Sequence, residues 1–197
     1  ADVCLQQVPI FMEKLEEVSL RKIYTDVEAP LLPTLVNMEY HGVYVDQKIM
    51  WEMSQWMEGQ LDSFSTEIYN LAETEFNINS PQQLATVLFD DLALPQVRKR
   101  STDVNVLESL RSQHPLPEKV LDYRKFQKLK STYVDALPAL VNPYTTRVHT
   151  SYNQAGSVTG RISSNEPNLQ NIPIGTELGR KIRFAFIPKD VDWRLLA

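Results

Sequence analysis

The strongest constraint on the fold is a long stretch of helical periodicity in the first half of the chain. From Asp46 to about Phe76, apolar residues recur every three or four positions, which is typical of an amphipathic helix that Asp46 caps. A second long helix is predicted from Pro117 to about Leu140, and Asn142-Pro143 ends it. We therefore expect an antiparallel helical region. The predicted buried stripe of the first helix consists of Ile49, Met50, Met53, Met57, Leu61, Phe64, Ile68 and Leu71.

Shorter helices are predicted in front of the first long helix. Residues 4–20 show helical spacing, with Leu5, Val8, Phe11, Met12 and Leu15 on one side. Asp26 is placed to cap a further helix that runs to about His41, where Gly42 is a suitable stop. Residues 43–45 are predicted to be a short extended piece.

Two more short helices are predicted between the long ones. Ser80 is an expected N-cap, and Gln83 completes a capping box for a helix that ends near Asp91. Either residue of Ser101-Thr102 is placed to cap a helix that runs to about Ser112.

The sequence pattern changes after Asn142. Residues 147–153 alternate apolar and polar side chains, which predicts a half-buried strand, and residues 184–187 and 193–196 are predicted to form two more. The predicted fold class is therefore α+β and mainly α, with long antiparallel helices followed by the first antiparallel strands of a sheet.

A polar run from Thr159 to Pro173 interrupts these strands. It contains one Arg, one Gln and three Asn, punctuated by Gly160, Pro167 and Pro173. This composition excludes a core helix or core strand and predicts a rigid loop. Arg, Asn and Gln are the side chains that best reach base edges, sugars and phosphates. A loop built only for turns is the competing interpretation, although such a loop seldom carries so many of these side chains.

The net charge of −5 conceals an uneven distribution of charge along the chain. Residues 1–96 contain four basic and sixteen acidic residues, whereas residues 97–197 contain sixteen basic and nine acidic residues. A polyanion is therefore expected to meet the second part of the chain, with the acidic part facing away or toward other protein.

Several functional classes are excluded or disfavoured by what the sequence lacks. The single cysteine, Cys4, excludes an internal disulfide and a multi-cysteine metal site. No apolar run approaches the ~20 residues that cross a bilayer, and the first residues show no signal-peptide pattern. We expect no membrane association and a cytoplasmic location. There is no Gly-rich phosphate loop and no His-Glu-x-x-His motif, and no carboxylate pair is placed to hold two catalytic metal ions.

The helix predicted after Pro117 carries a cluster of cations. Arg124 and Lys128 are four residues apart and share one face, which Lys125 and Lys130 flank. Such a row suits a phosphate backbone, and a merely solvated helix face is the competing interpretation.

The polar run resembles a known signature. Residues Thr159–Pro173 are similar to the Thr-Gly-Arg-Leu-Ser-Ser-x-x-Pro-Asn-Leu-Gln-Asn-Ile-Pro sequence of family A DNA polymerases, the bacterial DNA polymerase I group. The resemblance covers essentially the whole chain in the order of the family. The other segments that carry it are residues 38–46, 76–84, 123–133, 147–151 and 183–186.

The resemblance implies roles for individual residues. A thumb would hold the product duplex, and Arg161 would reach the minor groove near the primer terminus. The amides of the signature would contact the template–primer there, where the acceptors look alike for all correct base pairs. The DNA-binding residues implied in this way are Arg124, Lys128, Lys130, Thr159, Arg161, Asn168, Gln170 and Asn171.

Two positions depart from the family pattern. Ile162 stands where Leu is usual, which is a mild change. Gly175 stands where the family usually has Arg, which puts in doubt the phosphate contact implied for that position.

The resemblance also implies domain bounds. Residues 1–22 would be the tail of a 3′–5′ exonuclease-like domain, residues 23–143 the thumb and residues 144–197 the start of the palm. In the family, an Asp-Tyr-Ser motif whose Asp binds catalytic Mg²⁺ follows a strand like residues 193–197, so the metal-binding Asp is expected beyond Ala197. We therefore expect no catalytic residue and no bound metal ion in this stretch, which by itself should be inactive.

These observations lead to one interpretation and two alternatives. The chain is interpreted as part of a DNA polymerase I that performs template-directed DNA synthesis in replication and repair. We expect that polymerase to be cytoplasmic and associated with the nucleoid. Its partner would be primer–template DNA, and the parent protein would use deoxynucleoside triphosphates and Mg²⁺. The alternatives are a free-standing duplex DNA-binding module without catalysis and a structural domain without DNA affinity.

Overall fold

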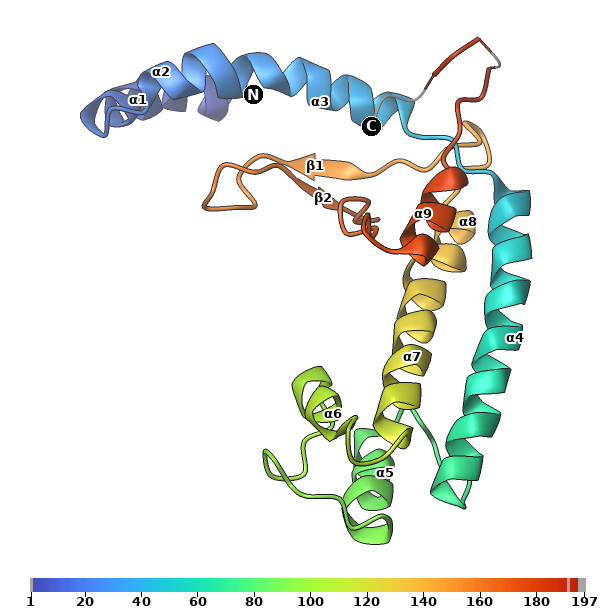
Figure 1. The fold of residues 1–197 in the computed structure, drawn as a ribbon. Helices are drawn as coiled ribbons and strands as arrows, with labels where there is room; N and C mark the ends of the chain where they lie inside the picture. Colours follow the sequence, from blue (N-terminus) through green and yellow to red (C-terminus); the bar gives the residue numbers. More distant parts are fainter. Residues whose placement is uncertain (1, 191, 195–197) are drawn as a thin grey trace. The chain divides into compact units, whose positions relative to one another are not determined.

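The computed structural model describes residues 2–190 and 192–194, which form two compact units (Figure 1). Of these described residues, unit 1 comprises 2–45, 140–176, 186–190 and 192–194. Unit 2 comprises residues 46–139 and 177–185. Helices predominate in the described part, with a two-stranded antiparallel sheet. The predicted class, α+β and mainly α, is therefore confirmed, whereas the predicted domain bounds stay predictions.

Unit 1 begins with two helical stretches that a turn at Ser19 separates. The first is α1 (Asp2–Glu17), and the second runs without a break through α2 (Arg21–Ile23), the π-helical η1 (Tyr24–Glu28) and α3 (Ala29–His41). The predicted cap at Asp26 is wrong, because Asp26 lies inside η1. The backbone N–H groups that it would cap already donate to main-chain carbonyls of the preceding turn, as Ala29 N–H does to Tyr24 O.

The apolar face predicted for α1 is not buried within unit 1. The side chains of Leu5, Val8 and Phe11 are 69%, 50% and 58% exposed, and no residue of Asp2–Glu17 is buried. The prediction of a helix was correct, but helical spacing alone does not show what covers the apolar face.

Gly42 ends α3 as predicted and starts the extended piece at residues 43–45. Its φ is +59°, and a Cβ at this position would lie 2.6 Å from the carbonyl oxygen of Val148. This close approach lets Val43 and Val148 exchange two backbone hydrogen bonds of 2.9 Å. Glycine is needed here because other residues rarely adopt this backbone conformation.

The sheet of unit 1 consists of β1 (Ser151–Asn153) and β2 (Ser163–Asn165), with Tyr152 opposite Ser164. The strand predicted at residues 147–153 is therefore shorter than expected. The polar run was predicted to be a loop throughout, yet β2 lies within it, so this expectation was partly wrong. A strand of small polar residues shows no apolar alternation, which is why sequence pattern did not reveal it.

Unit 2 contains the predicted antiparallel pair of long helices (Figure 1). Helix α4 (Gln47–Ala72) packs against α7 (Leu116–Leu129). The Asp46 carboxylate caps α4 by accepting from the N–H groups of Lys48 and Ile49 at 2.9 and 3.1 Å. The helix ends at Ala72, four residues before Phe76, and the next residue, Glu73, has a left-handed backbone conformation. Within the predicted stripe, the buried residues are Met50, Met53, Met57, Leu61 and Ile68.

The shorter helices of unit 2 pack around one end of α4 and α7. They are α5 (Pro81–Thr86), the π-helical η2 (Val87–Asp91) and α6 (Val104–Leu110). Their shared core contains Ile68, Leu84, Leu88, Leu107, Leu110, Leu116 and Val120.

At two helices of this region, the observed capping contacts differ from the predicted ones. Ser80 caps α5 as expected, but the Gln83 side chain accepts from Asn77 N–H rather than completing a box with Ser80. The cap of α6 is Asp103 rather than Ser101 or Thr102, because its carboxylate lies 3.0 Å from Val106 N.

The second long helix is divided where one continuous helix was predicted. After α7 come the π-helical η3 (Lys130–Val134) and α8 (Ala136–Ala139). The regular pattern of bonds four residues apart is lost before α8, because Asp135 N–H donates to the Lys130 carbonyl, five residues earlier, at 2.9 Å.

Helix α9 (Glu177–Phe184) ends at the first residue of the strand that was predicted at residues 184–187. That prediction was wrong, since only Phe186 pairs with an extended segment, at Val45. The signal for a helix was present, because Leu178 and Ile182 are four residues apart and both buried.

The last predicted strand, at residues 193–196, lies partly outside the described residues, and its first two residues are not in a strand. Ala197, beyond which the metal-binding Asp of the family is expected, also lies outside the described residues. The expected position of that Asp therefore stays a prediction.

Candidate nucleic-acid interface

Polar contacts fasten the hairpin β1–β2 to the helical stretch of unit 1. Glu39 of α3 accepts a hydrogen bond from the backbone N–H of Tyr152 through its carboxylate. The Gln154 side chain donates to the Glu28 carboxylate at 2.7 Å. Burial, together with the negative charge of Glu39, raises the pKa of the Tyr152 hydroxyl. The polar run therefore extends from a hairpin that is fixed to a helix.

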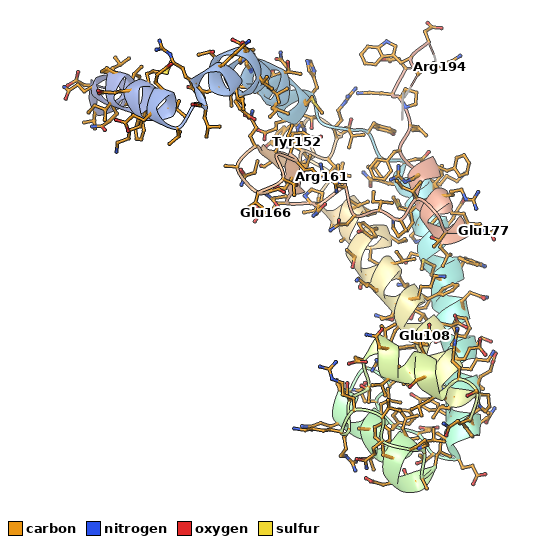
Figure 2. All side chains as sticks on the ribbon, turned by 60° about the vertical axis from the view of Figure 1, so that its left-hand side comes forward. Glu108, Tyr152, Arg161, Glu166, Glu177 and Arg194 are labelled. Atoms are coloured by element: carbon orange, nitrogen blue, oxygen red, sulfur yellow. The ribbon has the colours of Figure 1, made fainter. Side chains whose placement is uncertain are left out.

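We call residues Thr159–Pro173 the signature loop. It begins at a turn in which the Thr159 hydroxyl lies 2.8 Å from the Ser157 hydroxyl and Gly160 has a φ of +75°. Arg161 follows this turn with an exposed side chain at the hairpin (Figure 2). Within the described part of the chain, its guanidinium has no hydrogen-bond or ion-pair partner. All five of its N–H donors are therefore available to a ligand.

The three predicted amides of the signature loop differ in how much of their bonding capacity is used internally. The Asn168 oxygen accepts from Gln170 N–H at 3.1 Å, which leaves its amide nitrogen as a donor. The Gln170 amide nitrogen donates to Ile162 O at 2.8 Å, which leaves its oxygen as an acceptor. Asn171 is exposed, and its side chain makes no contact of this kind with other described residues. The loop thus presents both donors and acceptors.

In unit 2, the end of α7 and the start of η3 carry four basic residues, Arg124, Lys125, Lys128 and Lys130, and we call this segment the basic helix. Arg124 is partly buried and donates through both terminal nitrogens to Thr102, to its carbonyl oxygen and to its hydroxyl. Burial lowers the pKa of the Arg124 guanidinium. This side chain therefore ties α7 to the segment that precedes α6.

Lys130 also has protein partners. Its ammonium lies 2.8 Å from the Glu58 carboxylate and 2.9 Å from that of Asp135, and its side chain is only 13% exposed. Burial by itself would lower the pKa of Lys130, but the hydrogen bonds that its ammonium donates to the two carboxylates, together with their negative charges, outweigh burial and raise the pKa. A phosphate would have to compete with two carboxylates for this charge.

Lys128 and Lys125 remain exposed on the basic helix. Neither ammonium is paired with a residue of the described chain. They are three positions apart, so they lie on neighbouring turns of one side of the helix. Lys125 was not among the predicted site residues, although its place beside Lys128 was visible in the sequence.

Helix α9 adds cations to unit 2. Arg180 is exposed, whereas Lys181 lies 4.7 Å from the centre of the Trp56 ring and 3.2 Å from the Glu177 carboxylate. Figure 2 shows Glu177 at this helix. Lys181 therefore helps to hold α9 against α4, since a cation over an indole ring is attracted to it.

The described residues contain neither a cluster of metal ligands nor a membrane-spanning helix. No three His, Cys, Asp or Glu residues among them lie together in a way that could hold a metal ion. They do not fit a Mg²⁺ site, and we assign no metal-dependent step to them. Among the described helices, none has the length and apolar character required to cross a membrane.

Comparison with known proteins identifies the family. The sequence model of DNA polymerase family A matches residues 47–197, which is most of the chain and includes the basic helix and the signature loop. The chain belongs to DNA polymerase family A. This confirms the family to which the signature pointed.

Individual family A proteins show the same relationship. The chain is 48% identical over 190 residues to DNA polymerase I of Geobacillus stearothermophilus, covering 94% of this chain and 22% of the relative. It is 46% identical over 181 residues to the thermostable DNA polymerase I of Thermus aquaticus, covering 89% of this chain and 22% of the relative. This chain thus spans about a fifth of the length of these polymerases.

A solved structure has the same fold. It is the POL domain of Pol1 from M. smegmatis in complex with DNA primer-template and dNTP. The TM-score is 0.84 at 35% sequence identity, and the match covers 93% of this chain and 33% of that one.

Proposed function

We propose that this chain is the duplex-holding part of a DNA polymerase I that performs template-directed DNA synthesis in replication and repair. The observation that carries the proposal is the free guanidinium of Arg161, presented from an anchored hairpin beside the amides of the signature loop. The family membership supports the same role, as does the primer-template bound to the structurally similar Pol1 domain. In the whole protein, which would act at the nucleoid, Mg²⁺ and deoxynucleoside triphosphates would serve synthesis.

The signature loop would read the minor groove of the duplex. Purine N3 and pyrimidine O2 are acceptors in every correct pair, so Arg161 and the Asn168 amide nitrogen can donate to them without regard to sequence. Thr159, Gln170 and Asn171 would complete the contacts of the loop. Such readout suits an enzyme that must accept all four correct pairs.

The basic helix would hold the phosphate backbone, and its residues would contribute unequally. Lys128 is free to contact phosphate, and Lys125 beside it adds a second charge. Arg124 and Lys130 stay predicted contacts, but each would have to exchange protein partners for DNA. We therefore expect them to contribute less than Lys128. The thumb assignment, residues 23–143, is part of this proposal.

Binding to a labelled primer–template by fluorescence anisotropy tests the proposal. We expect Arg161→Ala to weaken binding on the order of 10-fold, because several charge-assisted hydrogen bonds are lost. The matched control is Arg21→Ala, which removes an exposed arginine from the same unit and should change affinity little. No binding of the wild-type chain even at low salt would contradict the proposal and favour a structural domain.

A modified DNA sharpens this test. A primer–template that carries a 3-deazapurine at its terminal pair has C–H in place of the minor-groove N3 acceptor. This substitution should weaken binding of the wild-type chain but not of Arg161→Ala, because the contact it removes is already absent. Equal weakening in both proteins would exclude Arg161 as the reader of that acceptor. The expectation that these residues alone do not extend a primer stays a prediction, which the same DNA tests with Mg²⁺ and nucleotides.

A further inference from the structure

Two buried hydroxyl groups lie at the hairpin of unit 1, one just before β1 and the other within the signature loop. Thr150 is 6% exposed and Ser164 is 1% exposed, and their hydroxyl oxygens are 2.7 Å apart. Thr150 precedes β1, and Ser164 lies at the centre of β2. Because burial of a polar group is unfavourable unless it is hydrogen-bonded, both hydroxyls are expected to have hydrogen-bond partners.

The partners of this pair are backbone groups at the end of β2 and in the turn that follows it. The Thr150 hydroxyl oxygen lies 2.9 Å from Asn165 O and 2.8 Å from Pro167 O. The Ser164 hydroxyl oxygen lies 3.1 Å from Pro167 O and accepts from Leu169 N–H at 3.2 Å. The two hydroxyls therefore contact the turn at three successive points.

A hydroxyl carries a single hydrogen, which restricts how these contacts can be made together. One arrangement places a hydrogen between the two hydroxyl oxygens and another between Thr150 and the carbonyl oxygens, which are the shortest contacts of the pair. Leu169 N–H donates to Ser164, the Ser164 hydroxyl donates to Thr150, and the Thr150 hydroxyl donates to the carbonyl oxygens of the turn. Hydrogen bonds in such a chain strengthen one another in a buried site.

We propose that Thr150 and Ser164 are positioning residues for DNA binding by the signature loop, an inference that rests on the function proposed above. Leu169 lies between Asn168 and Gln170, so its bond to Ser164 fixes the backbone from which both amides project. The Gln170 side chain donates to the carbonyl oxygen of Ile162, so the position of Gln170 also restricts the backbone next to Arg161. Neither hydroxyl is exposed enough to touch DNA, and both act through the loop.

Thr150→Val tests this inference with little change in side-chain volume. Valine cannot accept from Ser164 or donate to the turn. Hydrogen exchange at the Leu169 amide of the free protein should become on the order of 10-fold faster, because its anchor is loosened. Primer–template affinity should fall by a similar factor, and the penalty for the 3-deazapurine should shrink. Thr150→Ser keeps the hydroxyl and should restore both properties.

Two further variants separate positioning from simple loss of stability. Val148→Ala destabilises unit 1 at a buried apolar position two residues away, and it should leave Leu169 exchange relative to neighbouring amides unchanged. Ser164→Ala removes the other hydroxyl and serves if Thr150→Val does not fold. Affinity that follows overall stability alone across these variants would overturn the positioning role.

The outcomes distinguish failure of this inference from failure of the proposed function. If the wild-type chain does not bind primer–template, the proposed function fails, and the DNA-binding role of Thr150 and Ser164 fails with it. Hydrogen exchange at Leu169 would still show whether the two hydroxyls hold the turn. If the wild-type chain binds but Thr150→Val binds equally well, only the positioning role is overturned. Unchanged exchange at Leu169 in Thr150→Val would show that the hydroxyl chain does not hold the turn.

Discussion

In the signature loop, Arg161 and Asn171 have no partner among the described residues, whereas two of the four cations of the basic helix, Arg124 and Lys130, are held by protein groups. The sequence made both regions candidates for contact with DNA and favoured the signature loop. The difference shows that a count of cations on a helix overstates the charge available to a ligand, because some of them stabilise the fold. In the loop, internal hydrogen bonds orient the amides of Asn168 and Gln170 and leave part of each free.

The largest effect that tests this comparison is expected at Arg124. Arg124→Ala leaves the carbonyl and hydroxyl of Thr102 without their charged donor, and Thr102 is itself buried. The free energy of unfolding should fall by about 2 kcal/mol, measured by urea denaturation. The control Lys125→Ala, at the adjacent exposed position, should stay within about 0.5 kcal/mol of the wild type. If Arg124→Ala is stable but loses DNA affinity, Arg124 is a phosphate contact and the comparison fails.

A smaller effect, on affinity rather than stability, is expected at Lys128. Lys128→Ala should weaken primer–template binding roughly 5-fold at low salt, which corresponds to about 1 kcal/mol. One lost phosphate contact should also reduce the dependence of log Kd on log salt by about 0.9. Lys119→Ala is the matched control, because Lys119 lies on the same helix but is paired with Glu67 at 2.6 Å. An equal loss in the control would indicate that only net charge matters.

The smallest effect is expected at Gly175, where the family usually has arginine. A Cβ at this position would meet no heavy atom within 4 Å, so a larger side chain can be accommodated. Gly175→Arg should improve primer–template affinity roughly 2-fold, because a phosphate contact is gained but no protein group preorganises the new side chain. Gly175→Gln tests whether length without charge has the same effect. Unchanged affinity and salt dependence in Gly175→Arg would place residue 175 away from the phosphates.

Local chemistry made some elements predictable and left others hidden. The cap at Asp46, the cap at Ser80 and the stop at Gly42 depend on residues within one helical turn, so they could be predicted from the sequence. The strand β2 could not, because its pairing partner β1 lies ten or more residues away and its residues are small and polar. Helix α9 could have been found, since Leu178 and Ile182 have helical spacing, but the apolar run that follows favoured a strand.

The candidate site divides in the same way. Family membership, the polar character of the signature loop and the basic helix are properties of residue order, and the sequence by itself determined them. Which side chains are free was decided by tertiary structure. Arg124 meets Thr102 across 22 positions, and Thr150 meets Ser164 across 14. A hydrogen bond depends on separation in space and on direction, and the order of residues along the chain specifies neither for groups so far apart.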